Sequence, residues 1–422
     1  MMKNFKAKKI TALLLAVLML LALPSCNNAD GGEETTFTTE APAPQDPTPP
    51  EVEMLPSQAV TVLGQNLENA SADTINKRAP AMIEYLLSSG ADSIGVQECV
   101  EAWTDRLDEG LKGKYARVGV ECMTGADKGW FSTYVYYRKD KYRVIATDTF
   151  WLSTTPDVPS KYSDTVDLPR TCTWVILEDL ETGFRYVHMN CHLDWMDKVV
   201  NAIQVQMIRA QMIRFAEMGY PVFATGDLNT AEGSITYQQM LASEWISNSK
   251  YVAKKTDTTP SHLGNNETID YCFVTGGNMT VEEYAVIDHI HNGTEVSDHN
   301  GIMVHAMVAS IPKPDHGKTV AQFDSNAELT VNKNGDVTVT LAQARDANGR
   351  TAKQYDFVLK DENGATIVSE TSAFGYYNRP LQPLTVSAVL TDGESGKTYQ
   401  LEITPISILG DKGNTIVRSI IW

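Results

Sequence analysis

Several apolar stretches of this sequence end in a carboxylate, an amide or an imidazole. Glu98 closes the run SIGVQ, Asp227 and Asn229 follow PVFATG, and Asp298 with His299 precede NGIMV. A charged group at the end of a buried strand is unfavourable unless it meets a metal ion or a hydrogen-bond donor. Repetition of this pattern indicates that the polar residues converge on one site. Carboxylates bind hard divalent cations and imidazole exchanges protons near neutral pH, so the chemistry indicated is metal binding combined with proton transfer.

The elements that would position these residues alternate between strands and helices from about residue 56 to residue 312. The pattern predicts buried strands, two hairpins and two amphipathic helices. The strands are expected at 59–67, 92–99, 221–229, 268–276 and 299–308, the hairpins at 133–153 and 171–193, and the helices at 75–90 and 196–219. A mixed β-sheet layered with helices follows, which is an α/β fold. The polar residues lie at strand ends, where loops usually build active sites.

The pattern of polar and apolar residues changes after residues 312–318, and we interpret this segment as a hinge. Short strands of alternating polar and apolar residues follow, separated by turn dipeptides such as Asn-Gly and Asp-Gly. This pattern predicts an all-β sandwich at 319–422. The segment GKTYQLEITPISILGDKG resembles a strand pair of fibronectin type III domains.

The N-terminal part of the chain is predicted to be a leader followed by a tether. Residues 3–9 are basic, residues 10–23 are apolar but too few for a comfortable membrane span, and a small residue precedes Cys26. This order resembles a bacterial lipoprotein signal peptide, with residues 1–25 removed and Cys26 lipidated. An ordinary signal peptide with an incidental cysteine is the alternative. Residues 26–53 are rich in Thr, Pro and Glu, which predicts a disordered tether.

The formal net charge of −18 argues against long nucleic acids as the favoured substrate. A negative field repels a polyphosphate chain, and the sequence has no Lys/Arg-rich run with interleaved aromatic residues. An acidic nuclease that works through metal ions is still compatible with this charge. The six cysteines lack CxxC spacing, so those beyond Cys26 are expected to be buried small hydrophobic residues, with one disulfide pair left open.

Together the polar residues follow the motif order of a known family. The motifs are, in chain order, Gln65-Asn66-Leu67, Val96-Gln97-Glu98, Tyr136-Tyr137-Arg138-Lys139-Asp140, His192-Leu193-Asp194, Gly226-Asp227-Leu228-Asn229, Ile269-Asp270-Tyr271 and Ser297-Asp298-His299. This series resembles the endonuclease/exonuclease/phosphatase superfamily, which has the deoxyribonuclease I-like fold. The resemblance sets the catalytic domain at 54–312. It implies a four-layer α+β sandwich, in which two packed mixed β-sheets are flanked by helices, and hydrolysis of phosphate esters.

The resemblance also implies a divalent cation, Mg2+ or alternatively Mn2+, as the cofactor. A phosphate ester resists attack because the nucleophile meets negative oxygens, and a hard cation held by oxygen ligands polarises the phosphoryl group. Glu98 is the expected direct ligand of this cation. Asn66 and Asp298 would complete or orient its coordination shell.

The remaining motif residues have expected roles in proton transfer and charge stabilisation. Water must lose a proton to attack phosphorus, and His299 is the expected base. Asp270 would hold His299 in one tautomer and stabilise its cation. Asp227 would position the water or help to protonate the leaving oxygen. Asn229 and His192 would donate hydrogen bonds to the phosphoryl oxygens as charge develops.

Two further segments, FWLSTTPDVPS and LPRTCTW, resemble a bacterial branch of the family whose substrates are largely unassigned. Tyr137 and Arg170 are expected to contact the substrate. Cys191 departs from the branch, which usually has Thr before His-Leu-Asp. Because cysteine is a weak hydrogen-bond donor, we expect weaker support of His192. The histidines outside the motifs are expected to be structural, and they are His188, His262, His289, His291, His305 and His316.

The function expected from the sequence is Mg2+-dependent hydrolysis of a phosphate mono- or diester outside the cytoplasm. The enzyme would be a monomer, anchored to a membrane of the bacterial cell envelope through lipid on Cys26. The sequence leaves the substrate open among phosphodiesters, phosphorylated polyols, phospholipid headgroups and extracellular nucleic acid, of which nucleic acid is less favoured. The alternatives are a nuclease or sphingomyelinase-like phosphodiesterase and a non-catalytic surface binding lipoprotein. The second alternative predicts lost catalytic residues, whereas the set is complete here.

Overall fold

The computed structural model describes residues 57–276, 279–309, 320–324, 326–334, 336–347, 351–373 and 385–422. The predicted signal peptide, the lipidation site at Cys26, the tether and the hinge at 312–318 lie outside the described residues. Within the described part of the chain, no helix is both long and apolar enough to cross a membrane.

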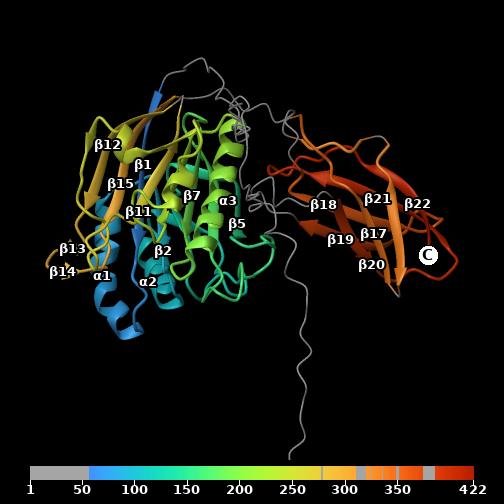
Figure 1. Ribbon diagram of the computed structural model, residues 1–422, viewed down its shortest axis with the longest axis horizontal. Coiled ribbons are helices and arrows are strands. Elements are labelled where there is room, and N and C mark those ends of the chain that lie inside the picture. Colours follow the sequence, from blue (N-terminus) through green and yellow to red (C-terminus); the bar gives the residue numbers. More distant parts are fainter. Residues whose placement is uncertain are drawn as a thin grey trace, which may run out of the picture. The chain divides into compact units, whose positions relative to one another are not determined.

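The first large sheet of the catalytic part has seven strands in the order β10-β12-β15-β1-β2-β4-β3 (Figure 1). Their bounds are β1 Ser57–Asn66, β2 Ser93–Gln97, β3 Tyr115–Val118, β4 Val135–Arg138, β10 Lys255–Thr256, β12 Met279–Ile287 and β15 Gly301–Ala309. The central strand β1 runs parallel to β2 and antiparallel to β15. The sheet is therefore mixed, as the sequence predicts.

The second large sheet has six strands in the order β5-β6-β7-β8-β11-β9. Their bounds are β5 Tyr142–Trp151, β6 Thr171–Asp179, β7 Arg185–His192, β8 Val222–Asp227, β9 Ile246–Asn248 and β11 Asp270–Thr275. Strands β7 and β8 are parallel, while β11 runs antiparallel to β8. A small separate hairpin joins β13 Ile290–His291 to β14 Thr294–Glu295.

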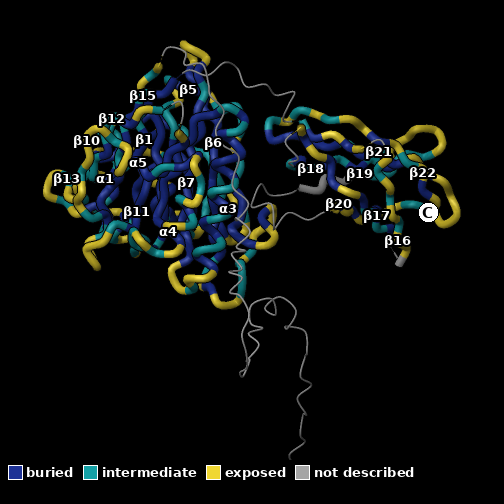
Figure 2. The backbone as a smooth tube through the Cα atoms, turned by 45° about the horizontal axis from the view of Figure 1, so that its top comes forward, coloured by how far each residue is buried: buried dark blue, intermediate teal, exposed yellow. Residues whose placement is uncertain are grey.

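Helices α1 and α2 pack on the first sheet, α3 and α4 pack on the second sheet, and α5 contacts strands of both (Figure 1). Their bounds are α1 Ala72–Ser88, α2 Glu101–Leu111, α3 Lys198–Glu217, α4 Ile235–Met240 and α5 Ser249–Val252. One apolar core joins α1 and α2 to the first sheet, a second joins α3 and α4 to the second sheet, and a third fills the space between the sheets. Figure 2 shows these buried layers as continuous dark blue segments. The predicted four-layer α/β fold is confirmed.

Polar side chains also connect the two facing sheets. The imidazole of His188 on β7 makes hydrogen bonds of 2.7 Å to Ser93 Oγ on β2 and 2.8 Å to Thr225 Oγ1 on β8. Gly95 lies against this layer, because a Cβ there would collide with Thr225 Oγ1 and stand 2.6 Å from Asn190 Oδ1. Glycine at position 95 thus lets the sheets approach closely.

One predicted element is wrong in its pairing. Residues 133–153 form β4 and β5, but these strands are not a hairpin: β4 pairs with β2 and β3, whereas β5 pairs with β6 in the other sheet. The chain crosses between sheets at the residues that follow Arg138. A turn pattern between two strand-like runs does not distinguish a hairpin from such a crossing, because both need a short polar connection.

Within its described residues, the C-terminal part consists of strands in two sheets, ordered β16-β17-β20 and β19-β18-β21-β22. Their bounds are β16 Leu329–Asn334, β17 Asp336–Ala342, β18 Gln354–Lys360, β19 Thr366–Ala373, β20 Thr385–Leu390, β21 Thr398–Ile406 and β22 Ile416–Ile421. Burial alternates along β18 and β20, as expected for strands with one face on a core. The all-β prediction is confirmed, and the fibronectin type III resemblance stays a prediction.

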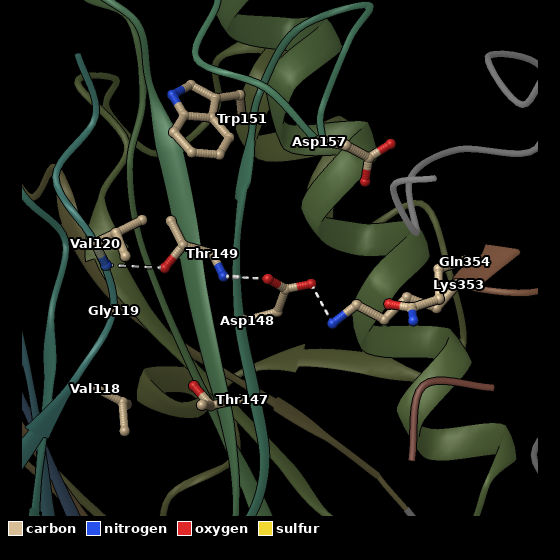
Figure 3. A pocket seen from close by; sticks show the side chains of 10 residues that line it. All are labelled: Val118, Gly119, Val120, Thr147, Asp148, Thr149, Trp151, Asp157, Lys353 and Gln354. Atoms are coloured by element: carbon tan, nitrogen blue, oxygen red, sulfur yellow. Dashed lines mark hydrogen bonds and ion pairs between the residues drawn. The ribbon is translucent and has the colours of Figure 1, made fainter. Parts of the chain in front are cut away.

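A hollow of about 550 Å³ lies beside β5 and the start of β18 (Figure 3). Asp148 and Lys353 line it and form an ion pair at 2.6 Å between Oδ2 and Nζ. None of the sequence-predicted site residues lines this hollow. It is therefore separate from the candidate active site.

Candidate active site

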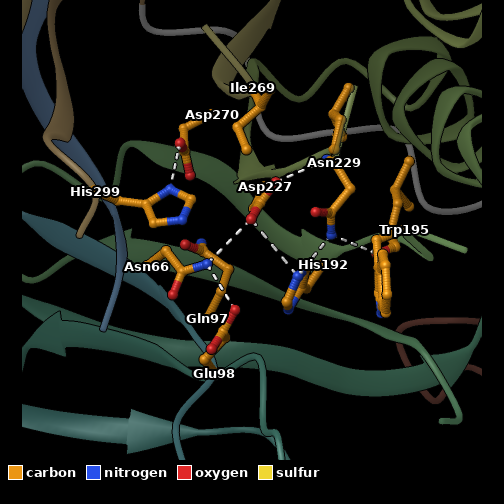
Figure 4. A network of polar contacts seen from close by, with 12 residues as sticks. Asn66, Gln97, Glu98, His192, Trp195, Asp227, Asn229, Ile269, Asp270 and His299 are labelled. Carbon is orange, nitrogen blue, oxygen red and sulfur yellow. Dashed lines mark hydrogen bonds and ion pairs between the residues drawn. The ribbon is translucent and has the colours of Figure 1, made fainter. Parts of the chain in front are cut away.

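The predicted site residues gather at one edge of the two facing sheets (Figure 4). Parallel strands bring their carboxyl ends to the same edge, and antiparallel partners begin there. Register pairs align His192 with Asp227 across β7 and β8, and Asp227 with Asp270 across β8 and β11. The other members lie at the ends of first-sheet strands: Asn66 at the end of β1, Glu98 directly after β2, and Asp298 and His299 directly before β15.

Asn66 links two carboxylates at the centre of the site. Its Nδ2 donates to Asp227 Oδ2 at 3.0 Å and to Glu98 Oε1 at 3.2 Å, while its Oδ1 accepts from the backbone N–H of Glu68 at 3.0 Å. Asn66 therefore bridges two acids through its amide nitrogen. The metal ligation predicted for Asn66 stays a prediction, because its Oδ1 accepts a single hydrogen bond and keeps one lone pair. Glu98 is held further by the backbone N–H of Asn69, which donates to Oε2 at 2.8 Å.

His299 and Asp270 form the predicted pair. His299 Nδ1 lies 2.7 Å from Asp270 Oδ2, which also accepts from Ser261 Oγ at 2.7 Å. Burial lowers the pKa of His299, but the charge of Asp270 and this hydrogen bond outweigh it and, with Asp227 and Asp298, raise that pKa to about 10. Without a cation the imidazole therefore keeps its proton at neutral pH. The base role predicted for His299 requires an added positive charge nearby.

Asp227 is the most buried acid of the centre, with 2% of its surface exposed. Burial, and then the negative charge of Asp270, raise the pKa of Asp227 to about 7. Its Oδ1 accepts from the backbone N–H of Asn229 at 2.7 Å. Asp227, Asp270 and Glu98 lie close together, so their negative charges repel one another. A bound cation would reduce this repulsion.

His192 is supported by neighbours other than Cys191. Asn229 Nδ2 lies 2.9 Å from His192 Nε2 and donates to Leu193 O, also at 2.9 Å, while the ring of Phe131 stacks on His192 at 5.9 Å between centroids. Burial, followed by the charges of Arg170 and His299, holds the pKa of His192 well below its usual range. The imidazole is therefore neutral. The weak contact of Cys191 Sγ with Thr225 O at 3.7 Å leaves this support intact.

The donor atoms of the site fit a hard divalent cation. Carboxylate oxygens dominate, and the buried Oδ1 atoms of Asp270 and Asp298 have no hydrogen-bond partner among the described residues. Three overlapping groups place their ligand atoms within 4.8 Å of one another: Glu98, His192 and Asp227; Asp227, Asp270 and His299; His262, Asp298 and His299. Glu98 and Asp298, both predicted as ligands, fall in different groups.

His262 was expected to be structural, but the structure places it at the site. Its ring lies 4.7 Å from that of His299, and its backbone N–H donates to Glu267 O at 3.0 Å. His262 Nδ1 faces Asn265 Oδ1 at 2.6 Å, which leaves Nε2 for the site. Local spacing could not reveal this residue, because its contact with His299 arises from pairing between segments distant in sequence.

Of the two predicted substrate contacts, the structure brings only Arg170 to the site. Arg170 is 4% exposed, its guanidinium lies 5.7 Å from the Phe131 ring centroid, and its Nε stands 4.0 Å from Asp194 Oδ2. Arg170 Nε and Nη1 have no hydrogen-bond partner among the described residues. Tyr137 pairs with Ser93 at the opposite end of β2 and packs against the core between the sheets. The length of β2, which has five residues, separates Tyr137 from Glu98.

Backbone strain gathers around the same edge. Four non-glycine residues there adopt left-handed φ values between 50° and 59°, and they are Glu68, Glu98, Phe131 and Asn229. Such conformations are unfavourable for residues with a side chain and are often found at functional sites. Here they turn the chain sharply after β2 and β8, which directs Glu98 and Asn229 into the site.

The four-layer fold with acids and imidazoles at one sheet edge defines a class of hydrolases that cleave phosphate ester bonds. The sequence profile of the endonuclease/exonuclease/phosphatase family matches residues 62–299, more than half of the chain. The chain belongs to this family. Its members act on phosphoester bonds and generally use divalent metal ions.

Solved structures agree with this assignment over the catalytic part. An endonuclease/exonuclease/phosphatase family protein from Bacteroides thetaiotaomicron is 26% identical, with a TM-score of 0.55, and the match covers 60% of this chain and 98% of that one. A mannosyl-6-phosphatase from the same organism is 27% identical, with a TM-score of 0.53, and the match covers 58% and 99%. No curated protein matches the chain.

Proposed function

We propose that the chain is a divalent-cation-dependent phosphatase that releases inorganic phosphate from a phosphorylated sugar. The observation that carries the reaction class is the convergence of Glu98, Asp227 and the His299–Asp270 pair, with Asn66 donating to two of the acids. A non-catalytic binding protein would have no need to keep this crowded and electrostatically unfavourable set.

Each residue has a task in the proposed reaction. Mg2+ or Mn2+, when bound, would neutralise charge on the phosphoryl oxygens and help to orient the ester, and Glu98 with Asp298 would hold it. His299, oriented by Asp270, and Asp227 are the two groups that could take a proton from water. Asn229 donates to His192 Nε2 and to Leu193 O, so in place of the direct donor role expected from the sequence it would hold the neutral imidazole of His192 in position. The phosphorus–oxygen bond to the alcohol breaks, and the departing oxygen takes up a proton.

Arg170 would bind the phosphoryl group from the side of His192. Its buried guanidinium carries two nitrogens without hydrogen-bond partners among the described residues, and unpaired buried donors are unfavourable. A phosphoryl oxygen would satisfy them with charge-assisted hydrogen bonds. The Arg170→Lys variant should therefore raise KM more than it lowers kcat, because the planar fork is lost while the charge remains.

The sugar part of the proposal rests on the likeness to the mannosyl-6-phosphatase, together with charge. That protein matches along 99% of its own length and is 27% identical to this chain. The net charge of −18 is unfavourable for a polyphosphate chain but not for a small ester neutralised by a metal ion. The predicted features at the N-terminus support a further proposal, namely that lipid on Cys26 anchors the enzyme to a membrane of the cell envelope, outside the cytoplasm.

A substrate panel tests the proposed function. Phosphate release from mannose 6-phosphate with Mg2+ should exceed the hydrolysis of bis-(p-nitrophenyl) phosphate and of DNA by at least tenfold in kcat/KM. Higher activity on the diesters would replace the phosphatase by the phosphodiesterase alternative. Absence of turnover on every ester, with folded protein and either Mg2+ or Mn2+, would contradict the proposal as a whole.

A further inference from the structure

A cleft of about 550 Å³ opens next to the candidate metal ligand Glu98. It lies between the N-terminal ends of α1 and α2 and the segment that precedes β4, and its walls include Asn69, Ser71, Glu101 and Trp130. Asn69 connects the cleft to the reaction centre, because its backbone N–H donates to Glu98 Oε2 at 2.8 Å. Its volume lies within the range of small-molecule binding sites.

Trp130 stands on a segment that is fixed from within. The carboxylate of Glu121, a residue only 2% exposed, accepts backbone N–H groups from Met123 at 2.7 Å and Trp130 at 3.4 Å, and also that of Thr124. Cys122 Sγ donates to Trp130 O at 3.2 Å. The buried carboxylate of Glu121 thus fixes the short segment that carries Trp130, and Trp130 is 48% exposed. The core gains little from this indole, so ligand binding is a better account of its position.

The cleft and the catalytic histidine are connected by aromatic contacts. The Trp130 ring lies 6.0 Å from that of Phe131, which stacks on His192. Phe131 has a φ of 53°, a left-handed conformation that turns successive side chains in different directions. One ring therefore packs on the catalytic imidazole while its neighbour lines the cleft. Phe131 therefore links the cleft to His192.

The lining of the cleft selects an uncharged, hydroxyl-bearing ligand. Glu101 and the neighbouring Glu98 place negative charge there, which disfavours a second phosphate or a nucleotide. Val100, the N-cap residue of α2, provides no side-chain cap for the first-turn N–H groups, so these can donate to hydroxyl oxygens. Trp130 offers a flat face to ring C–H groups. These features together match a pyranose ring better than an aliphatic chain or an anion.

We propose that this cleft is the subsite for the sugar ring of the substrate, with Trp130 as its stacking platform. This inference rests on the proposed function, because it places the alcohol part of a phosphorylated sugar beside the phosphoryl site. Asn69, Ser71 and Glu101 supply polar groups for the ring hydroxyls. Trp130 is then a specificity-determining residue, since it binds the part of the substrate that differs between esters.

Steady-state kinetics with mannose 6-phosphate and glycerol 3-phosphate test the subsite in the presence of Mg2+. Trp130→Ala should lower kcat/KM for mannose 6-phosphate about tenfold, or about 1.4 kcal/mol, and lower that for the acyclic ester less than threefold. Trp130→Tyr should restore most of the loss. Tyr251→Ala removes another aromatic residue, 64% exposed and outside the cleft, and should leave both values unchanged.

Two results would overturn the subsite. One is an equal change for both esters in Trp130→Ala. The other is a selective loss in Trp195→Ala but not in Trp130→Ala. Trp195 is 54% exposed and lies beyond His192 as seen from Glu98 (Figure 4), and it would then be the platform.

A binding measurement without phosphate or metal separates this inference from the proposed function. Saturation-transfer NMR with methyl α-mannopyranoside should show transfer to ring protons with the wild-type protein and lose it with Trp130→Ala. Mannoside binding without turnover of any ester would contradict the phosphatase and leave the subsite standing. Turnover of mannose 6-phosphate without Trp130-dependent binding would contradict the subsite alone.

Discussion

At the residue scale, Asn66 occupies the position where two acids approach each other. Its amide nitrogen donates to both Glu98 and Asp227, so part of their mutual repulsion is offset without a cation. His299 and His192 have opposite states in the same site: the pKa of His299 is raised to about 10, and that of His192 is lowered. One imidazole is therefore a cation and the other a neutral hydrogen-bonding group, which suits them to different tasks.

Replacement of His299 by alanine tests its part in the reaction. The variant should lose a factor of about 10²–10⁴ in kcat, the usual range for a positioned proton-transfer group. His299 lies at the edge of the sheets, so the thermal unfolding midpoint should move by only a few degrees. His305→Ala, in the middle of β15, is the matched control and should keep its kcat. Retained turnover in His299→Ala would remove this residue from the mechanism.

Residue identities at the site could be predicted largely from the order of motifs, while their contacts could not. Asn66, Glu98 and His299 are marked by strand-end positions that the sequence displays. The contact of His262 with His299 depends on pairing between separate loops. The orientation of the Asn66 amide depends on which acids surround it. Neither property has a local signal.

At the element scale, the site depends on how closely the two sheets pack. Gly95 on β2 faces Thr225 and Asn190 of the other sheet, and His188 makes hydrogen bonds to both sheets. Strand ends that carry Glu98 and Asp227 are therefore held at a fixed separation. The connection from β4 to β5 links the two sheets covalently. Residues 133–153 therefore contribute one strand to each sheet instead of a hairpin to one of them.

Gly95→Ala should destabilise the fold by about 1–3 kcal/mol, because the added methyl group must push the sheets apart. Gly113→Ala is the control, since a Cβ there would meet nothing within 4 Å. Urea unfolding of both variants measures the difference. Equal stability of Gly95→Ala and Gly113→Ala would mean that the sheets are not packed as closely as described.

Stability should also depend on pH through His188. Burial lowers the pKa of His188 to about 3 in the folded chain, whereas an unfolded chain protonates near its ordinary value of 6.5. Because the unfolded state binds this proton first, its contribution to stability is complete above pH 6.5 and declines as pH falls towards 3. Between pH 7 and pH 5 the loss is about 2 kcal/mol.

Urea unfolding of His188→Asn at these two pH values measures this contribution. The variant is less stable throughout but should lose about 2 kcal/mol less than the wild-type chain between pH 7 and pH 5. His305→Asn serves as the control and should follow the wild-type dependence. An unchanged pH dependence in His188→Asn would assign the effect to other groups.

At the scale of the whole molecule, a strongly acidic chain carries a site for an anionic substrate. The net charge of −18 repels phosphate esters at a distance, so binding must come from local positive groups. Arg170 and the proposed cation supply these charges. The layered architecture could be predicted from sequence because strand and helix patterns are local. The all-β C-terminal part could be predicted for the same reason. The pairing of β4 and β5 with different sheets is a long-range property that local patterns lack.

The central claim, that a divalent cation held at Glu98 supports phosphate ester hydrolysis, has a direct test. Phosphate release from mannose 6-phosphate is measured against Mg2+ concentration, with the wild-type protein and with Glu98→Gln. We expect saturable activation by Mg2+, complete loss with EDTA, and a loss of at least 100-fold in Glu98→Gln at the same Mg2+ concentration. Full activity in EDTA, or wild-type activation of Glu98→Gln, would contradict the account.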